Sequence, residues 1–297
     1  MSCSETETWR SVAIRRRICV VLAAWGFFIG LCIILTFAIQ AFAGVPEDAD
    51  AAYRRGDYAG AARAYQLLAD QGSADAQNSL GELYYKGQGV AQDYAQAAKW
   101  YRRAAEQGHV MAQDHLGPMY LEGKGVEQDY GEAIKWFRRA AALGFADAQY
   151  NLGYMYLRGR GIEQDLHQAA TWFSRAAEQG YAEAQFILGI MYRVGGGVRQ
   201  DSTKAANWFG RAAEQGHAEA QGYLAKAYYD GEGVPQEFVS AYKWCALAKT
   251  RARDVRVREM ATKTCDTVAA AMSPVQIAEA QQLAREWKPT SMETVTR

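Results

Sequence analysis

Hydrophobic and polar residues follow helical rather than strand spacing through most of this chain, and their pattern returns every 36 residues. Within one copy, Ala148, Leu152 and Tyr156 lie on one stripe about 100–150° wide, as in a helix with one buried face. Two positions mark five successive copies: Gln77, Gln113, Gln149, Gln185 and Gln221, and Trp100, Trp136, Trp172, Trp208 and Trp244. A fixed period of this length predicts a solenoid of helix pairs, in which each unit buries its apolar face against its neighbours.

Each copy also carries signals for the beginning and end of its two helices. An aspartate stands three residues before a glutamate or glutamine, as in Asp129 and Glu132, which is the spacing of a capping box. The other pairs are Asp93 with Gln96 and Asp165 with Gln168. A glycine follows the second helix, where a left-handed residue is expected: Gly108, Gly144, Gly180 and Gly216. Each unit is therefore predicted as a helix, a glycine loop, a second helix and a tight turn.

The spacing Gln77-x-x-Leu80-Gly81-x-x-Tyr84, followed by Ala97-x-x-x-Tyr101, resembles the tetratricopeptide pattern with its leading tryptophan replaced. The loop between the helices is longer and carries G-x-G-V-x-Q-D, which is similar to the Sel1-like repeat family. The resemblance covers residues 75–250. It implies an all-α, right-handed α-solenoid of Sel1-like helix pairs that is used mainly for protein–protein contacts.

The two ends of the array depart from the repeat. Residues 51–72 form a shorter copy without the loop insertion, and Ala64 replaces the tryptophan. After Arg251 the rhythm stops, although Ser273 and Pro274 have the spacing of an N-cap and the first residue of a helix. The predicted segments are a basic n-region (1–17), a membrane anchor or signal peptide (18–43), an N-terminal capping repeat (47–72), five repeats (75–251), C-terminal capping helices (252–288) and a disordered tail (289–297).

The N-terminus predicts export. Arg15, Arg16 and Arg17 precede the 22 uncharged residues from Ile18 to Ile39, a length that can span a bilayer, and the arginines favour a cytoplasmic N-terminus. The sequence before Gly44 also fits a signal-peptidase site. Two outcomes stay open: an inner-membrane anchor with the array facing the periplasm, or a cleaved protein that is periplasmic or secreted.

Composition adds two constraints. The chain has 33 basic residues (lysine plus arginine) and 33 acidic residues (aspartate plus glutamate). It therefore has no net positive charge that would favour nucleic acid as a partner. Cys245 and Cys265 lie in the exported body, on helices expected to turn near Asp254. An oxidising compartment would permit a disulfide between them, and two buried thiols are the alternative.

Few residues suggest chemistry. His109 and His217 occupy a turn position that aromatic residues fill in other copies, so we interpret them as turn-packing residues, and no metal-ligand pattern surrounds them. The glycine loops follow helices and lack the lysine and Ser/Thr of a phosphate-binding loop. We therefore predict no cofactor, no metal and no enzymatic activity. A hydrolase-like enzyme on the same scaffold is the rival hypothesis.

The candidate site is a surface. In the first helix of a copy, Leu80, Gly81 and Tyr84 face inward, so positions 78, 79, 82 and 86 face away and, in tetratricopeptide-like solenoids, line the concave side. The third and fourth copies place aromatic, apolar and basic residues there. The candidate partner-binding residues are Tyr150, Tyr154, Arg158, Phe186, Ile187, Ile190 and Val194. Pro118 lies in the second copy at the position that Glu82 has in the first, and a proline inside a helix predicts a kink there.

Exposed apolar side chains of this kind indicate a partner site, whereas burial within the array would explain them structurally. The resulting hypothesis is a cell-envelope scaffold or adaptor that binds protein partners through the concave face. A binder of a cell-wall or peptide ligand is the alternative.

Overall fold

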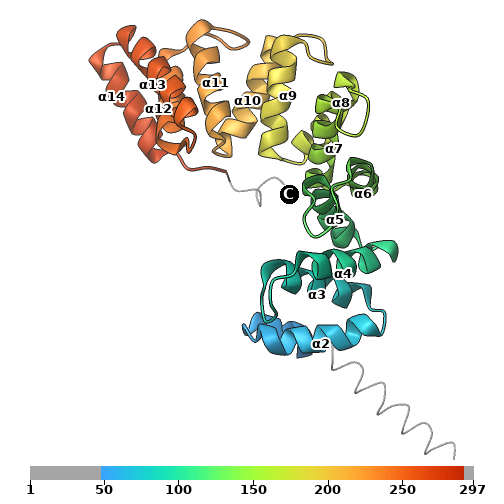
Figure 1. The fold of residues 1–297 in the computed structure, drawn as a ribbon. Coiled ribbons are helices and arrows are strands. Elements are labelled where there is room, and N and C mark those ends of the chain that lie inside the picture. Colours follow the sequence, from blue (N-terminus) through green and yellow to red (C-terminus); the bar gives the residue numbers. More distant parts are fainter. Residues whose placement is uncertain (1–47, 291–297) are drawn as a thin grey trace, which may run out of the picture. The chain divides into compact units, whose positions relative to one another are not determined.

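The computed structural model describes residues 48–290, and they are helical with no strand. Residues 48–54 are helical and are followed by α2 (Tyr58–Asp70). The first helices of the five full copies are α3 (Ala74–Lys86), α5 (Val110–Glu122), α7 (Ala146–Arg158), α9 (Ala182–Val194) and α11 (Ala218–Asp230). The second helices are α4 (Tyr94–Glu106), α6 (Tyr130–Ala142), α8 (Leu166–Glu178), α10 (Ser202–Glu214) and α12 (Phe238–Arg251). Two more helices, α13 (Val255–Ala270) and α14 (Pro274–Glu286), complete the described chain (Figure 1).

The chain divides into two compact units, Met1–Ala104 and Ala105–Arg297. In the first unit, the predicted capping repeat packs Tyr65 and Leu68 of α2 against Leu80 and Leu83 of α3, and Trp100 joins this cluster. In the second unit, helices α5 to α12 pack in sequence as helix pairs, and α13 and α14 pack on α12. This arrangement confirms the prediction of successive helix pairs, while their right-handed sense stays a prediction.

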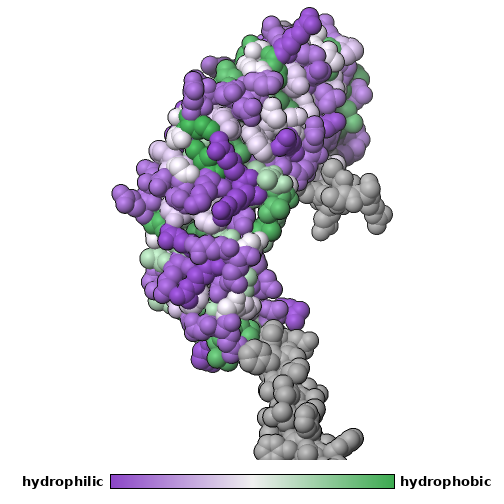
Figure 2. All heavy atoms as spheres, turned by 90° about the vertical axis from the view of Figure 1, so that its right-hand side faces the viewer, coloured by the Kyte–Doolittle hydropathy of each residue, from purple (hydrophilic) through white to green (hydrophobic). Residues whose placement is uncertain are grey.

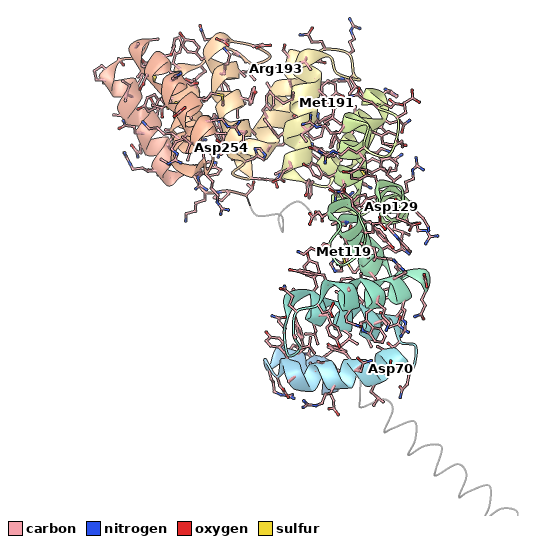
Figure 3. All side chains as sticks on the ribbon, in the orientation of Figure 1. Asp70, Met119, Asp129, Met191, Arg193 and Asp254 are labelled. Atoms are coloured by element: carbon pink, nitrogen blue, oxygen red, sulfur yellow. A yellow bond between two sulfur atoms is a disulfide. The ribbon has the colours of Figure 1, made fainter. Side chains whose placement is uncertain are left out.

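The caps form as the sequence predicts, with one difference. Asp129 Oδ1 accepts from the backbone N–H groups of Gly131 and Glu132 at 2.8 and 3.0 Å, which starts α6 (Figure 3). The Glu132 carboxylate instead contacts Lys135 Nζ at 2.9 Å. The reciprocal box forms at Ser273, whose side chain caps Gln276 while the Gln276 side chain accepts from the Ser273 N–H.

Two glycine positions have a steric reason. A Cβ on Gly153 would lie 3.0 Å from the Phe173 ring, so the glycine permits the close packing of α7 on α8. Gly197, in the loop after α9, has φ +73°, and a Cβ there would lie 2.1 Å from the Leu166 carbonyl oxygen. Gly197, the second glycine of the loop, therefore lets the loop pack closely against the start of α8, the second helix of the preceding copy.

The glutamines that mark the period have a structural role. Each is at most 6% exposed. Gln185 Nε2 donates to the Ala177 carbonyl at 3.0 Å, near the C-terminal end of α8, where backbone acceptors lack helical partners. The same contact recurs from Gln77 to Ala69, Gln113 to Ala105, Gln149 to Ala141 and Gln221 to Ala213. The recurring amide thus joins each second helix to the helix that follows it.

The outer surface of the second helices is solvated. Figure 2 views the side that carries α6 and α8, and it is mostly hydrophilic. The guanidinium of Arg139 lies 4.8 Å from the Trp136 ring centre, and Arg175 lies 4.5 Å from that of Trp172. An arginine therefore covers the tryptophan of the same helix by cation–π stacking in the first four copies, and Lys243 lies over Trp244 in the fifth.

The C-terminal helices are fastened to the last repeat. Cys245 of α12 and Cys265 of α13 form a disulfide with their Cα atoms 5.5 Å apart, which decides between the two predicted alternatives. Beyond α14, Trp287 Nε1 donates to Glu214 Oε2 at 3.0 Å, and Thr290 N–H donates to the Glu214 carbonyl at 2.9 Å. The prediction of a disordered tail from residue 289 is therefore wrong for its first two residues, because Thr290 caps the C-terminal end of α10. Residues 291–297 lie outside the described range.

The predicted span, residues 18–39, also lies outside the described range. Between residues 48 and 290, no helix is both long enough and apolar enough to cross a bilayer.

Candidate functional site

The candidate residues of α7 lie on one stripe of that helix and pack partly against neighbouring elements. Tyr150 and Tyr154 are half-buried, with ring centres 6.5 Å apart. The Tyr150 ring also lies 5.7 Å from Phe173 of α8 and 5.0 Å from Tyr181, the residue before α9. Arg158 is exposed, and its guanidinium lies 5.4 Å from the Tyr154 ring centre.

Phe186 of α9 repeats this arrangement one copy later. Its ring centre lies 6.0 Å from Phe209, 4.7 Å from His217 and 5.5 Å from Tyr223. Phe186 is therefore largely a packing residue between α9, α10 and α11, which agrees with the alternative of burial within the array. Val194, three turns away from the start of α9, is 61% exposed.

The two remaining candidates are half-buried and belong to different clusters. Ile187 packs with Tyr150 and Tyr154 against the cluster of α8 and α9, whereas Ile190 packs with Phe186 against the cluster around Phe209 and Leu224. The seven candidates thus line one side of α7 and α9 as two adjoining groups. We call this surface, with the matching sides of α5 and α11, the first-helix face.

Two carboxylates at one edge of the first-helix face escaped the sequence analysis. Asp114 of α5 is half-buried, and burial, together with the charge of Asp147, raises the pKa of its carboxyl to about 6. Burial, together with the charge of Asp147 on α7, raises the pKa of Tyr181. Asp114 departs from the repeat, since the first copy has Asn78 there, and this departure was the available signal.

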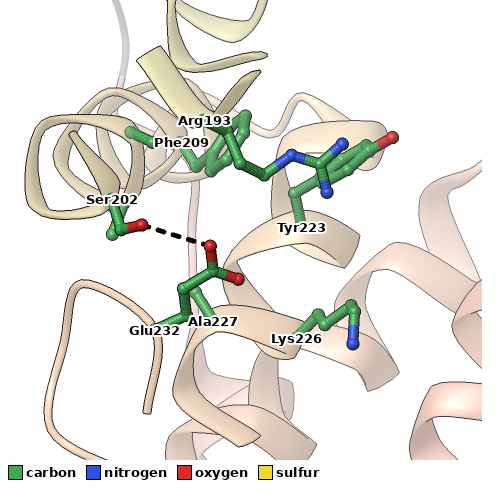
Figure 4. Close-up of a pocket in the computed structure, with 9 residues that line it drawn as sticks. Arg193, Ser202, Phe209, Tyr223, Lys226, Ala227 and Glu232 are labelled. Carbon is green, nitrogen blue, oxygen red and sulfur yellow. Dashed lines mark hydrogen bonds between the residues drawn. The ribbon is translucent and has the colours of Figure 1, made fainter. Parts of the chain in front are cut away.

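Tyr223 and Arg193 form the opposite region of the face. Tyr223 of α11 contacts the Phe209 ring at 5.2 Å, and the Arg193 guanidinium lies 4.6 Å from the Tyr223 ring centre. Figure 4 shows these side chains beside Lys226 around a small cavity of about 20 Å³. A cavity of this size holds about one water molecule. Sequence comparison of the copies could have found Tyr223, because the aligned positions hold Ser79, His115, Asn151 and Ile187.

Five consecutive segments match the family model described as Sel1 repeat: residues 74–109, 110–145, 146–181, 182–217 and 218–251. The chain belongs to the Sel1 repeat family. This confirms the resemblance drawn from the glutamine, glycine and loop positions, and the repeat boundaries differ from the predicted array by one residue at its start.

One solved structure in particular supports this membership. A Sel1 repeat protein from Oxalobacter formigenes is 34% identical, with a TM-score of 0.66, over 81% of this chain and 96% of its own. A protective antigen of uropathogenic Escherichia coli strains, described as displaying an SLR fold, is 28% identical over 82% of this chain and 68% of its own, with a TM-score of 0.35. A comparison with curated proteins gives no match.

Two of the four histidines of this Sel1 repeat protein act as helix caps. His217 Nδ1 accepts from the Ala220 N–H at 3.2 Å and also lies 3.4 Å from Glu219 Oε2. Burial lowers the pKa of His217. Because Nδ1 accepts a backbone hydrogen bond, the ring is neutral with its proton on Nε2, and the Glu219 contact is not an ion pair. His109 caps Ala112 in the same way at 3.2 Å, so both histidines cap helices in addition to packing in the turn.

Within residues 48–290, no group of three histidine, cysteine, aspartate or glutamate side chains could hold a metal ion. An open groove of about 780 Å³ runs beside α10 and α12 and is lined by scaffold residues such as Leu224, Tyr228 and Trp244. The departures from the repeat are therefore concentrated on the first-helix face.

Proposed function

We propose that this Sel1 repeat protein is a non-enzymatic adaptor of the bacterial cell envelope, which binds protein partners through the first-helix face. Sel1 repeat proteins mediate protein–protein interaction in general, and Sel1 scaffolds are typically non-enzymatic. The observation that carries the proposal is the group of incompletely buried side chains on α7 and α9. Tyr154 and Ile190 are half-buried and Val194 is 61% exposed, while the recurring glutamines and tryptophans serve the scaffold.

Aromatic and aliphatic side chains that keep part of their surface in water are the usual centre of a protein interface. A partner that covers them removes apolar area from water, at about 25 cal/mol per Å². The flanking guanidinium of Arg158 supplies a charged rim to the same surface.

The envelope location rests on two further features. Three arginines precede a 22-residue uncharged segment, and the Cys245–Cys265 disulfide suits an oxidising compartment. The mass of the protein purified from its natural host tests this part. A start at Gly44 indicates a cleaved signal, whereas an intact N-terminus in the membrane fraction indicates an anchor. An intact chain in the cytoplasmic fraction would refute export.

The partner site is tested by capture with the full chain from solubilised envelope proteins. A double variant, Tyr154→Ala with Ile190→Asp, is expected to lose partners that the wild type retains. The matched control is Leu67→Ala with Val255→Asp, which changes side chains that are 53% and 59% exposed elsewhere. Equal far-UV circular dichroism must show that all chains are folded. Partners that persist in the Tyr154 and Ile190 variant would refute the proposed surface.

A further inference from the structure

The first-helix face is polarised from one end of each helix to the other. On α7, Asp147, Tyr150, Tyr154 and Arg158 are separated by three, four and four residues, so they lie on one stripe of the helix. The order is acidic, aromatic, aromatic, basic. On α9 the equivalent positions hold Glu183, Phe186, Ile190 and the exposed Val194, and Arg193 directly precedes Val194.

The acidic edge contains a carboxylate without a partner. Asp114 is half-buried and makes no hydrogen bond or ion pair with any residue in the range 48–290. Asp147 and Glu183 add negative charge to the same edge, and Tyr150 and Tyr181 place aromatic rings 5.0 Å apart beside it. Carboxylates next to aromatic rings favour a cationic side chain.

The basic edge contains an unpaired donor. Arg193 Nε is buried and has no acceptor among the described residues. Glu232, which lines the same cavity as Arg193, accepts a hydrogen bond from Ser202 at 3.1 Å (Figure 4). An incoming carboxylate oxygen would therefore find guanidinium donors at Arg193 and Arg158.

Acidic residues near a helix N-terminus and basic residues near its C-terminus also complement the helix dipole. That effect accounts for Asp147 and Arg158 as exposed side chains. It does not account for Asp114, which is half-buried in the second turn of α5, or for the buried Nε of Arg193. These two groups lose hydration without gaining a hydrogen bond from residues 48–290, so an external partner is the better explanation.

We propose that the first-helix face binds an extended segment of a partner protein, in which a basic residue and an acidic residue flank apolar residues. Asp147 and Arg158 are eleven residues apart on a helix, which corresponds to about 16 Å. An extended chain covers about 3.3 Å per residue, so the two charged residues of the segment are about five or six positions apart. The basic residue lies at Asp114 and Asp147, and the acidic residue lies at Arg158 and Arg193. This inference rests on the proposed function, because it names the chemistry of the partner for the same face.

Three fluorescein-labelled nonapeptides with blocked termini test it by fluorescence anisotropy with the full chain. All carry Leu at position 4, Phe at position 6 and Ser elsewhere, and they differ in positions 2 and 8: Lys and Glu, Lys and Lys, or Glu and Glu. The Lys/Glu peptide is expected to bind about fivefold more tightly than either like-charged peptide at low salt, and the difference should shrink at high salt.

Neutral variants assign each end of the peptide. Asp114→Asn with Asp147→Asn and Glu183→Gln should make the Glu/Glu peptide bind as well as the Lys/Glu peptide. Arg158→Gln with Arg193→Gln should do the same for the Lys/Lys peptide. The control, Glu163→Gln with Arg199→Gln, changes exposed loop residues and should keep the wild-type ranking.

The inference is wrong if the three peptides bind equally or if none of them binds. It is also wrong if the loop control variant loses the ranking of the peptides. These outcomes are separate from the capture experiment. If partners depend on Tyr154 and Ile190 while the peptides show no ranking, the proposed function stands and the polarised site is wrong. If partners ignore Tyr154 and Ile190, the proposed function itself fails.

Discussion

Replacing Asp114 by asparagine should stabilise the protein at neutral pH. The Asp114 carboxylate is half-buried, faces the charge of Asp147 and has no hydrogen-bond donor from residues 48–290. Asparagine has the same shape and no charge, and the first copy already has Asn78 at the equivalent position. The substitution therefore removes the unfavourable charge without opening a cavity.

The sign and size follow from the pKa. Burial, with a smaller effect of Asp147, raises the pKa of Asp114 from 3.8 to about 6. The folded state then binds more protons than the unfolded state, so the free energy of unfolding decreases as the pH rises from about 4 to about 6, and it stays lowered at pH 7. A difference of about two pKa units corresponds to about 3 kcal/mol. Solvent screening of a partly exposed carboxylate reduces the expected gain for Asp114→Asn to about 1–2 kcal/mol.

Urea unfolding of the full chain in mild detergent, followed by tryptophan fluorescence from about pH 4 to about pH 7, measures both effects. The variant should be more stable at pH 7, equal to the wild type near pH 4, and less dependent on pH between them. Glu163→Gln, in an exposed loop, is the control and should change neither quantity. A variant that is less stable than the wild type at pH 7 would show that the Asp114 charge is compensated, and the reasoning would be wrong.

Three other substitutions test the scaffold by urea unfolding. Gln185→Leu should cost about 1–3 kcal/mol, because it removes two hydrogen bonds of a buried amide: the one donated to the Ala177 carbonyl, which keeps only the Gly180 N–H, and the one accepted from Gln215; no loss would show that water replaces the amide. Gly197→Ala should be destabilising because of its positive φ and the contact of a new Cβ, whereas Gly210→Ala, with nothing within 4 Å, should be neutral or stabilising by up to about 1 kcal/mol; equal effects would contradict the steric assignment. Cys245→Ser with Cys265→Ser should lose about 2–4 kcal/mol, and reductant should then have no further effect on the unfolding midpoint.

The repeat made the fold predictable from sequence, because a residue that recurs in every copy reports a contact that recurs too. Leu80 and Gly81 are predicted to face inward, and both are buried in the structure. The candidate site was less predictable. A wheel of α9 alone places Phe186 toward solvent, but its ring contacts Tyr223 from the next copy. A contact between two copies depends on the residues of both copies, whereas a helical wheel uses the residues of one helix alone.

The chain termini show a second limit of the same kind. Thr290 donates to a carbonyl of α10 that lies 76 residues earlier, and no periodic pattern relates the two positions. The disulfide was open for a similar reason, since the distance between Cys245 and Cys265 depends on where the chain turns between α12 and α13. Local signals such as Ser273 and Pro274 predicted where α14 starts, but not what the residues after it contact.

Gln149 and Asp114 show how the repeat separates structure from function. Both are polar and lie near the start of a first helix; Gln149 is buried and Asp114 is half-buried. Gln149 donates to the Ala141 carbonyl, accepts from Gln179 at 2.8 Å and recurs in all five copies, so its burial stabilises the array. Asp114 occurs in one copy, has no donor among residues 48–290 and is predicted to lower stability at neutral pH. A side chain that costs stability in one copy, beside half-buried aromatic rings, is better explained by a partner than by the scaffold.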